Sequence, residues 1–384
     1  MPFPPTYRAA YRFWLPTATT FFVNGACFGG WAALIPRAIA RLNADEGTFG
    51  LMLFGMGIGA VLAMAASGRL IARYGAGLLI RLSLALFLAA YIALSASSDW
   101  IVFIAALLLY GGAGGLMDVA MNAYAADVEG HMKWRVMASF HGMWSIGGLA
   151  GAAAAGALLA VVSDLAQAFI MTAGMLVLFI VSQHNLVPLQ HHAGERAGRH
   201  LAIGRLTLTL GVLTALSFSA EGAVRDWSSL FLTNEVRTTI DRAGWGFAAF
   251  SATMALCRLS GDWMRGRFGE RKVVSISGIV AVVGFAMAVM PTDYLLSIAG
   301  FALVGIGLSN IVPILISAAG RSDAPGPSIA FVVSFGYAGY LASPPILGFI
   351  ASQASLATMF LVVAASCAVI AAGWLFAEGA MSKA

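Results

Sequence analysis

Charged residues are scarce in this sequence. Asp, Glu, Lys and Arg make up only 10% of the 384 residues, whereas 60% are hydrophobic. This composition lacks the polar surface of a soluble globular protein and is typical of a chain that crosses a membrane many times. The longest markedly polar stretch runs from about residue 183 to residue 205, which is too short to bury a hydrophobic core of its own. The composition therefore argues against a separate soluble domain, while transport, signalling and intramembrane catalysis stay open.

Cysteine is equally rare. Cys27, Cys257 and Cys367 lie in separate apolar runs, and their odd number and wide spacing form neither a disulfide framework nor a metal-ligand pattern. We expect three buried, reduced thiols. Four histidines stand in the polar stretch without acidic or thiol partners at a ligand spacing, at positions 184, 191, 192 and 200. Neither a metal nor a cofactor is expected, since the sequence contains no nucleotide-binding loop either.

Long hydrophobic runs dominate the sequence instead. Charges, prolines and polar clusters divide it into twelve apolar segments, each long enough to cross ~30 Å of hydrocarbon as a helix. We place these segments at 12–36, 48–72, 76–97, 100–126, 137–162, 164–183, 205–232, 243–266, 272–291, 294–319, 325–350 and 352–377. The first segment follows Arg8 and Arg12 as in a signal peptide, but its length indicates an uncleaved spanning helix. Tight turns are expected at the acidic breaks Asp99, Asp164 and Asp293.

The distribution of basic residues predicts the orientation of the chain. Of the 22 Lys and Arg residues, sixteen lie at the termini, or in or beside the loops after the second, fourth, sixth, eighth and tenth segments. The opposite loops hold only four, which are Arg37, Arg41, Arg237 and Arg242. Because cytoplasmic loops are enriched in Lys and Arg, both termini are expected in the cytoplasm, with the chain in a bacterial inner membrane. The net charge of +5 does not indicate a nucleic-acid partner, since the basic residues are scattered through short loops.

The sequence also contains an internal repeat whose period is half the chain. Short matches pair residues 73–75 with 267–269, 115–118 with 307–310, and 139–140 with 334–335, at offsets of 194, 192 and 195. The matches occur in the same order and in equivalent segments. They predict two six-helix halves, residues 1–183 and 205–384, joined by a cytoplasmic linker at 184–204. Duplicated halves around a site near the bilayer midplane are a recurring transporter architecture.

The loop at 68–77 resembles the signature of the major facilitator superfamily, which is approximately Gly-x-Leu-x-Asp-Arg-x-Gly-Arg-Lys. The glycines, the leucine and the first arginine (Arg73) match, whereas Ala72 replaces the acid and an alanine and a glycine replace the final basic pair. An echo at 262–271 has Arg267 at the arginine position and also lacks the acid there. The resemblance covers nearly the whole chain. It implies an all-α polytopic membrane protein with twelve transmembrane helices in two pseudo-symmetric six-helix bundles, the major facilitator fold.

The same resemblance implies a gate of charged residues near the cytoplasmic ends of the helices. Arg73 and Arg267 stand at the signature positions of this gate. Because the signature acids are missing, Arg258 and Asp262, four residues apart in the eighth segment, are expected to take over part of the role. Arg225 in the seventh segment is a further gating candidate.

A narrower resemblance is to the rhizopine-transport-protein-like, or MosC-like, branch of the superfamily. It rests on the stretch 118–123 followed by Val128-Glu129, on the stretch 139–148, and on Glu221-Gly222 with Asp226-Trp227. The resemblance favours a polyol, a sugar or an inositol derivative as the substrate.

Two acids in apolar segments are the candidates for proton coupling. Asp118 and Asn122 lie four residues apart, so they share one face of a helix. A carboxylate that faced lipid near the bilayer centre would cost roughly 2.5–3.5 kcal/mol, so this face is expected to look inward. No cation stands near Asp118 in its segment, which favours a proton-carrying role over a permanent ion pair. Glu221 precedes Arg225 by four residues, the favourable order for an ion pair that is either permanent or opened by protonation.

Other polar and aromatic residues are candidates for substrate contact. In the superfamily that this chain resembles, the first, fourth, seventh and tenth helices line the central cavity. Residues of those helices and of the fifth and eleventh form the predicted binding set, which is Asn24, Asn122, Trp144, Asn310, Tyr337 and Tyr340. Asn24 is equally able to serve as a hydrogen-bonding residue between helices. Trp227 is expected at the membrane interface, and His141 is expected to be a packing residue rather than a proton carrier.

These observations predict a monomeric secondary transporter whose partners are a small solute, protons and the lipid bilayer. Proton-coupled uptake by alternating access is the favoured mechanism. Proton-coupled export of a metabolite or drug is the alternative, although the glycine-rich stretch 147–151 lacks the proline found in the exporter signature. An intramembrane enzyme using Asp118 and His141 would need a nucleophile motif or a metal site, and neither is present. A transporter-like sensor that binds solute without moving it is a further alternative.

Overall fold

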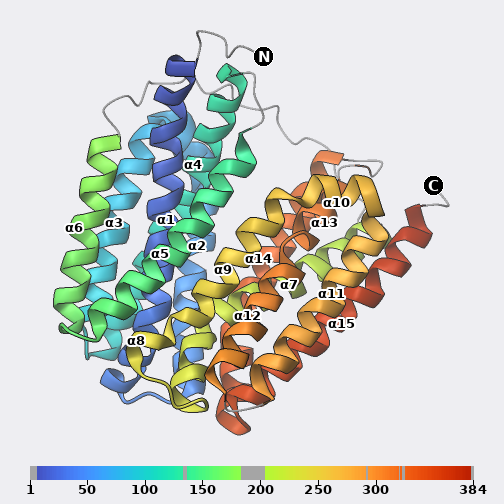
Figure 1. Ribbon diagram of the computed structural model, residues 1–384. Helices are drawn as coiled ribbons and strands as arrows, with labels where there is room; N and C mark the ends of the chain where they lie inside the picture. The colour runs from blue at the N-terminus through green and yellow to red at the C-terminus, as the bar shows by residue number, and fades with distance from the viewer. Residues whose placement is uncertain are drawn as a thin grey trace. The chain divides into compact units, whose positions relative to one another are not determined.

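The protein is a bundle of α-helices. The computed structural model in Figure 1 describes residues 7–132, 136–182, 204–290, 293–319, 321 and 325–381. These residues form helices and turns, with no β-strand among them, as the all-α prediction requires. The first six helices are α1 (Tyr7–Leu42), α2 (Glu46–Tyr74), α3 (Ala76–Ala96), α4 (Trp100–Met132), α5 (Met137–Leu159) and α6 (Asp164–Ser182). Each overlaps one predicted segment. The predicted linker at 184–204 and its histidines lie almost entirely outside the described residues.

The remaining helices depart from the prediction at two breaks. They are α7 (Arg205–Asn234), α8 (Ile240–Ala243), α9 (Trp245–Leu259), α10 (Gly261–Phe268), α11 (Glu270–Val289), α12 (Tyr294–Leu308), α13 (Ile311–Ala319), α14 (Pro325–Gln353) and α15 (Leu356–Met381). The predicted helix at 243–266 is interrupted at Ser260, and the predicted helix at 294–319 is interrupted at Ser309 and Asn310. A hydropathy pattern gives the total length of an apolar segment, and it cannot locate a break inside that segment.

Acidic side chains begin several helices at the predicted turns. The Asp99 carboxylate accepts a hydrogen bond from the Val102 amide at 3.0 Å, and Asp293 accepts one from the Leu296 amide at 2.9 Å. Both satisfy backbone N–H groups that a first helical turn leaves unpaired. Asp45 does the same for Thr48 before α2, and these hydrogen bonds lower the pKa of Asp45 below its ordinary value. Asp164 is the first residue of α6.

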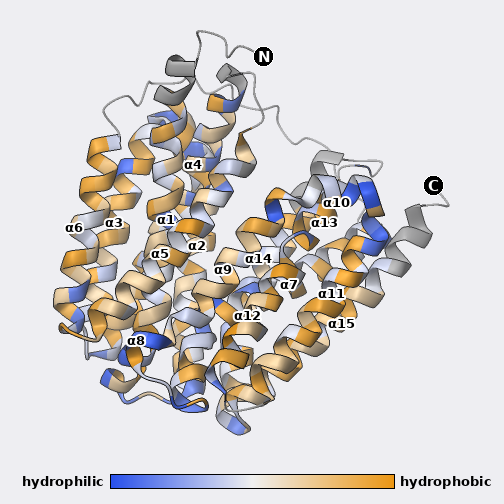
Figure 2. Ribbon diagram, viewed as in Figure 1, coloured by the Kyte–Doolittle hydropathy of each residue, from blue (hydrophilic) through white to orange (hydrophobic). Residues whose placement is uncertain are grey.

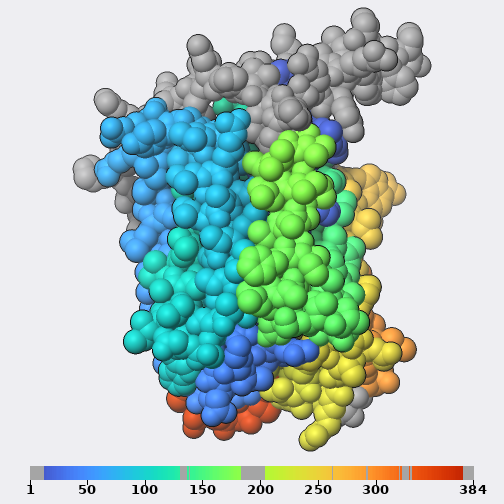
Figure 3. Space-filling model, turned by 90° about the vertical axis from the view of Figure 1, so that its left-hand side faces the viewer, coloured from blue at the N-terminus to red at the C-terminus, as the bar shows by residue number. Residues whose placement is uncertain are grey.

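Helix length and surface composition fit a membrane protein. Ten helical stretches among the described residues are long and apolar enough to cross a bilayer. The other two predicted spans correspond to the pair α9–α10 and to α14. Hydrophobic residues cover the middle of the helices in Figure 2. On the face drawn in Figure 3, α6 and its neighbour α3 present their side chains outward, and eight large apolar side chains of α6 are exposed. Such a surface is suited to lipid rather than to water.

The chain divides into two compact units, each packed mainly within itself. The first contains Met1–Asn43 and Gly55–Gly194, and the second contains Ala44–Phe54 and Glu195–Ala384. In the first unit α1 packs along α5, and α3 packs along α4. In the second unit α7 packs along α14, while α11 packs along α12 and α15.

The contact between α1 and α5 is a seam of glycines. A β-carbon added at Gly25 or Gly29 of α1 would clash with the backbone of Trp144 or Gly148 on α5. Added at Gly151, it would clash with the backbone of α1 in turn. The two helix backbones therefore touch directly, which is the role of small residues at four-residue spacing in membrane helices.

The internal repeat is visible in the backbone. Gly75 precedes α3 with φ 77° and ψ 150°, and Gly269 precedes α11 with φ 79° and ψ 151°. Only glycine adopts this conformation without strain. The two loops 73–75 and 267–269 thus turn in the same way, as the predicted pseudo-symmetry requires.

Candidate functional site

In the first unit, the predicted residues Asn24 and Trp144 lie together. The Trp144 indole N–H donates a hydrogen bond to the Asn24 Oδ1 atom at 2.8 Å, across the glycine seam between α1 and α5. Asn24 is only 1% exposed, and its Nδ2 atom has no hydrogen-bond partner among the described residues. A buried amide donor without a partner is costly, so this atom is an unsatisfied polar group inside the first unit.

Asp118 and Asn122 share one face of α4, as predicted. The Asn122 Nδ2 atom donates to the Asp118 carbonyl oxygen at 2.9 Å and to the Asp118 Oδ1 atom at 3.3 Å. Asp118 is half-buried, and α4 contains no lysine or arginine. A β-carbon at Gly111 would clash with the carbonyl of Met56 on α2, so glycine brings these two backbones together. The close contact with α2 therefore lies two helical turns before Asp118.

In the second unit, Glu221 pairs with Arg258 and not with Arg225 as the four-residue spacing suggested. The Arg258 Nη2 atom lies 3.5 Å from the Glu221 Oε2 atom, which is long for an ion pair. The Glu221 Oε1 atom is buried and has no hydrogen-bond partner within the described part of the chain. Both side chains keep about a quarter of their surface exposed. This loosely held pair connects α7 to α9.

Arg225 is bound to its neighbour Asp226. Its Nε and Nη2 atoms donate to the two Asp226 carboxylate oxygens, each at 2.8 Å, and its guanidinium lies 4.7 Å from the centre of the Tyr340 ring. A bidentate pair with a cation–π contact is a strong and specific arrangement. Trp227, expected at the interface, is instead completely buried, with its ring edge against Phe49. The sequence pattern could not separate a buried tryptophan from an interfacial one.

The breaks in the eighth and tenth helices are joined to each other by side chains. The Arg258 Nε atom donates to the Ser309 carbonyl at 3.3 Å, and the Asn310 Nδ2 atom donates to the Cys257 carbonyl at 3.2 Å. These bonds satisfy carbonyls near the helix interruptions. Gly261 leaves room for the Asn310 amide beside them, since a β-carbon there would clash with the Asn310 side chain.

This arrangement changes the interpretation of two predicted residues. Asn310 is 4% exposed, and its amide joins the two helix breaks, so it is occupied in holding the fold. Arg258 and Asp262, expected four residues apart in one helix, lie on two helices, because Ser260 interrupts the helix between them. The Asp262 side chain lies outside the described residues.

The other candidates are dispersed. Tyr337 packs on Phe218 with ring centroids 5.4 Å apart. Arg73 is exposed at the end of α2, with its guanidinium 5.2 Å from the Tyr74 ring centre, and Arg267 is exposed on α10.

His141 meets the ring of Phe21 edge-on, as a packing histidine would. Cys27 and Cys367 are buried free thiols, whereas Cys257, predicted buried, is only half-buried.

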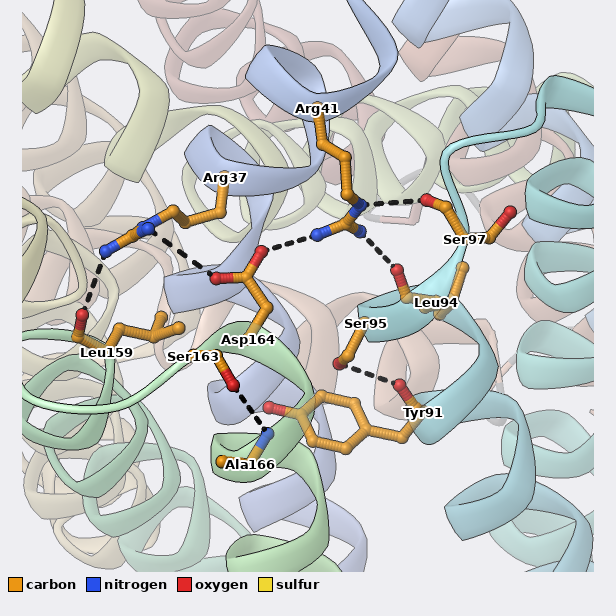
Figure 4. A network of polar contacts seen from close by, with 10 residues as sticks. All are labelled: Arg37, Arg41, Tyr91, Leu94, Ser95, Ser97, Leu159, Ser163, Asp164 and Ala166. Carbon is orange, nitrogen blue, oxygen red and sulfur yellow. Dashed lines mark hydrogen bonds and ion pairs between the residues drawn. The ribbon is translucent and has the colours of Figure 1, made fainter.

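A polar network in the first unit was missed by the sequence analysis, which treated Arg37 and Arg41 only as loop charges. Figure 4 shows both arginines of α1 pointing at Asp164. Arg41 also donates to the Ser97 carbonyl at 2.8 Å and to the Leu94 carbonyl. The network ties the end of α1 to the end of α3 and the start of α6. The sequence did contain a signal for this network: an acid stands at a predicted helix start, and two arginines stand at the end of another segment.

We expect Arg41→Gln to destabilise the first unit. Removing one partner of a buried ion pair costs about 3–5 kcal/mol, and the partial exposure of this pair reduces the expected loss to about 2 kcal/mol. Arg37→Gln is the matched control, because Arg37 is 3.8 Å from Asp164 and its side chain is 41% exposed. Thermal unfolding of the two purified variants measures the loss of stability in each. Equal losses would contradict the conclusion that Arg41 is the more important partner of Asp164.

No cluster of three or more His, Cys, Asp or Glu side chains that could hold a metal occurs in the ranges that the structure describes. What the two units offer is a set of hydrogen-bonding groups and two carboxylates within membrane-spanning helices. Such groups can bind a polar solute and gain or lose protons.

Comparisons with known proteins agree with this architecture. The family model of the Major Facilitator Superfamily matches residues 17–220 and 210–383. An uncharacterized MFS-type transporter of Yersinia pestis is 35% identical over 355 residues, which cover 91% of each chain. The membrane protein MosC of Rhizobium meliloti is 32% identical over 369 residues, covering 94% of this chain and 88% of MosC.

Solved structures share the fold at low sequence identity. A variant of the nucleoside transporter NupG matches with a TM-score of 0.77 and 14% identity, covering 95% of this chain and 99% of NupG. The Major Facilitator Superfamily transporter FucP matches with a TM-score of 0.62 and 16% identity, covering 94% of this chain and 97% of FucP. The chain therefore belongs to the major facilitator superfamily: it is a multi-pass membrane transporter of small molecules, not an enzyme, and it resembles the MosC branch.

Proposed function

We propose that this transporter takes up a small polar solute together with protons. The observation that carries the proposal is Asp118, a half-buried carboxylate in a membrane-spanning helix, hydrogen-bonded by Asn122. A carboxylate in such surroundings changes its charge when its access to water changes. Alternating access of the two halves to either side of the membrane supplies that change.

Glu221 is the second proton-coupling candidate, and its partner differs from the one expected. Arg258 holds only one of its two carboxylate oxygens, at 3.5 Å. Protonation of Glu221 would release Arg258, which would keep its bond to the Ser309 carbonyl. Arg258 therefore stays a gating candidate, and Arg225 becomes a weaker one because Asp226 already neutralises it.

The solute class follows from the hydrogen-bonding groups. The unpartnered Asn24 amide and the Asn122 side chain suit hydroxyl oxygens, and the Trp144 ring offers an apolar face to a sugar or an inositol ring. We therefore favour a polyol, a sugar or an inositol derivative. The likeness to a nucleoside transporter adds nucleosides to the solutes to be tested.

The test is the current that a solute evokes from proteoliposomes on a solid support. Inositols, sugars, amino sugars, nucleosides and lipophilic cations are applied at two pH values. An inward positive current for a polyol or sugar, larger at the lower outside pH, is the expected result. Responses to lipophilic cations alone would favour the alternative, proton-coupled export of a drug or metabolite. Product formation from a solute in detergent, without compartments, would overturn transport altogether.

The Glu221–Arg258 pair makes a separate prediction about stability. Arg258→Gln leaves the Glu221 carboxylate without its cation, so it should destabilise the protein more than Glu221→Gln does. The double variant should recover part of the loss, with a coupling of about 1 kcal/mol because the pair is long. Thermal unfolding of the unmodified protein, the two single variants and the double variant gives the four stabilities that this double-mutant cycle needs. Strictly additive losses would show that the pair contributes nothing.

The topology predicted from the sequence belongs to the same proposal. Both termini are placed in the cytoplasm and the chain in the inner membrane, as a monomer with bundles at 1–183 and 205–384 and a linker at 184–204. The excess of basic residues on one set of loops supports this orientation. Labelling of single cysteines introduced at Arg37 and Arg73 in intact cells would test it, since only the first should react from outside.

A further inference from the structure

Three helices of the second unit surround Glu221. α7 carries Glu221, Arg225 and Asp226, and it packs along α14 and against α9 (Figure 1). The Arg258 side chain of α9 lies 3.5 Å from one carboxylate oxygen of Glu221, and the other oxygen, Oε1, is buried without a hydrogen-bond partner among the described residues. Arg225 follows Glu221 by four residues, the order that favours an ion pair on a helix, yet it binds Asp226. The partner of Arg225 therefore determines how tightly Glu221 is held.

Asp226 needs Arg225 because the Asp226 carboxylate is buried. Its side chain is only 1% exposed, and a buried carboxylate is stable only when a cation and hydrogen bonds compensate its charge. The Arg225 Nε and Nη2 atoms supply both, since each donates to one Asp226 oxygen at 2.8 Å. Glu221 keeps 22% of its side chain exposed, so it depends less on a cation than Asp226 does. Asp226 is therefore the stronger competitor for the guanidinium of Arg225.

Tyr340 of α14 supports the guanidinium of Arg225 in this position. Adjacent residues on a helix do not face each other, so the Arg225 side chain has to turn towards Asp226 to pair with it. The guanidinium lies 4.7 Å from the centre of the Tyr340 ring, a cation–π contact that favours this placement. The ring comes close to α7 because residue 222 is glycine: a β-carbon there would lie 3.2 Å from the Tyr340 Cε2 atom. The ring thus holds the guanidinium where Asp226 binds it.

Few other ionisable groups surround Glu221 in the part of the chain that the structure describes. Arg258 is the charged residue of α9, and α12, α13 and α14 contain no Asp, Glu, Lys, Arg or His. Besides Tyr340, α14 brings Tyr337, which packs on Phe218 about one turn before Glu221. The charged residues of α8, which follows α7, and of α15 are Asp241, Arg242 and Glu378. The cations whose charge acts on Glu221 are Arg258 and Arg225.

We propose that Asp226 and Tyr340 are positioning residues that withhold Arg225 from Glu221, so that Glu221 keeps its long contact to Arg258 and can exchange a proton. The inference rests on the proposed role of Glu221 in proton coupling. A carboxylate held by two arginines would stay ionised throughout the transport cycle, whereas one held loosely by a single arginine can be protonated. Asp226 and Tyr340 act through Arg225 and do not carry the proton themselves.

Infrared absorption of the purified full-length protein measures the protonation of Glu221 without any solute. The band of protonated carboxyl groups is recorded from about pH 4 to about pH 9. Subtracting the spectrum of the matching Glu221→Gln protein isolates the band of Glu221 and gives the pH at which half of it is protonated. Asp226→Asn releases Arg225 to Glu221, so this pH should fall by about one unit. Removing the arginine as well, in R225Q/D226N, should restore the value of the unmodified protein.

Variants of Tyr340 and Glu270 complete the experiment. Tyr340→Leu removes the ring beside Arg225 and should lower the half-protonation pH of Glu221 by a smaller amount than Asp226→Asn does. Tyr340→Phe keeps the ring and should not change this pH. The Tyr340 pair also provides the test if Asp226→Asn fails to fold. Glu270→Gln removes an acid that binds two other arginines at the start of α11, so it changes the net charge equally and should leave the half-protonation pH unchanged.

Three results would overturn this inference while leaving the coupling role of Glu221 in place, because Glu221 still titrates in each of them. An unchanged half-protonation pH in Asp226→Asn or, if that variant does not fold, in Tyr340→Leu would show that Arg225 does not turn to Glu221. A fall that persists in R225Q/D226N would show that the effect does not pass through Arg225. An equal fall in Glu270→Gln would show a general effect of charge. If Glu221 stays ionised over the whole pH range in the unmodified protein, its coupling role and this inference both fail.

Discussion

Asp118→Asn should abolish solute accumulation driven by a pH gradient while leaving the fold intact. Asparagine has nearly the shape of aspartate, and its side-chain oxygen can still accept the bond that the Asn122 amide donates to Asp118. It cannot take up or release a proton. If Asp118 carries the coupled proton, the variant loses the uphill step by at least tenfold, whereas exchange of solute across the membrane continues.

Two assays on the same proteoliposomes separate coupling from binding. Accumulation under a pH gradient should fall, and counterflow with preloaded solute should persist. Asp127→Asn is the matched control, because this acid lies on the same helix, closer to its end. Undiminished accumulation by a correctly inserted Asp118→Asn protein would remove the residue from the mechanism. Loss of counterflow as well would assign it to solute binding instead of to coupling.

Gly29→Ala should prevent the first unit from folding stably, although it adds only one methyl group. The added β-carbon would fall on the carbonyl oxygen of Gly148 in α5, where neither backbone can move without opening the seam. Overpacking a core costs about 1–3 kcal/mol, and a collision between two backbones costs more than a collision between side chains. We expect a loss above about 3 kcal/mol, seen as little monodisperse protein after extraction.

The control is a glycine on a surface of the same unit. Gly174 of α6 has no atom within 4 Å of an added β-carbon. Alanine is a better helix former than glycine by about 1 kcal/mol, so Gly174→Ala should be neutral or slightly stabilising. Size-exclusion profiles and unfolding midpoints compare the two variants. If Gly29→Ala behaves like Gly174→Ala, α1 and α5 do not depend on glycine contact.

Gly29→Ala should also affect the residues proposed to bind solute. Asn24 and Trp144 meet across the same seam, with a bond of 2.8 Å between them. Any separation of α1 from α5 would lengthen this bond and displace the unpartnered Asn24 amide. A partly folded Gly29 variant should therefore lose solute binding before it loses helical content.

Local features of the fold were open to prediction from the sequence. Runs of apolar residues located the spanning helices, because a bilayer demands about the same length of hydrophobic helix from any chain. The acids Asp99 and Asp293 marked helix starts, since a carboxylate satisfies the amides of the first turn. The repeat paired the loops at Gly75 and Gly269, which share the same backbone conformation. Each of these features depends on neighbours along the chain.

Charge partners, by contrast, were decided by the tertiary structure. Spacing alone paired Glu221 with Arg225, but packing brings Arg258 of another helix to Glu221, while Arg225 takes the adjacent Asp226. The network of Arg41 and Asp164 likewise joins segments that are 123 residues apart. A charged side chain binds whichever opposite charge packing places within reach, and no periodicity in the sequence records that distance.

The positions of the helix breaks were also decided by the tertiary structure. Nothing in the apolar run around Ser309 and Asn310 signals an interruption, because the cost of a break depends on which groups are present to satisfy its carbonyls. Here Arg258 and Asn310 do so between the eighth and tenth helices. The sequence by itself determined the family, the spans and the presence of membrane-embedded acids. Only the folded chain decided what each polar group binds, since hydrogen bonds and ion pairs form between segments that are distant in sequence and adjacent in space.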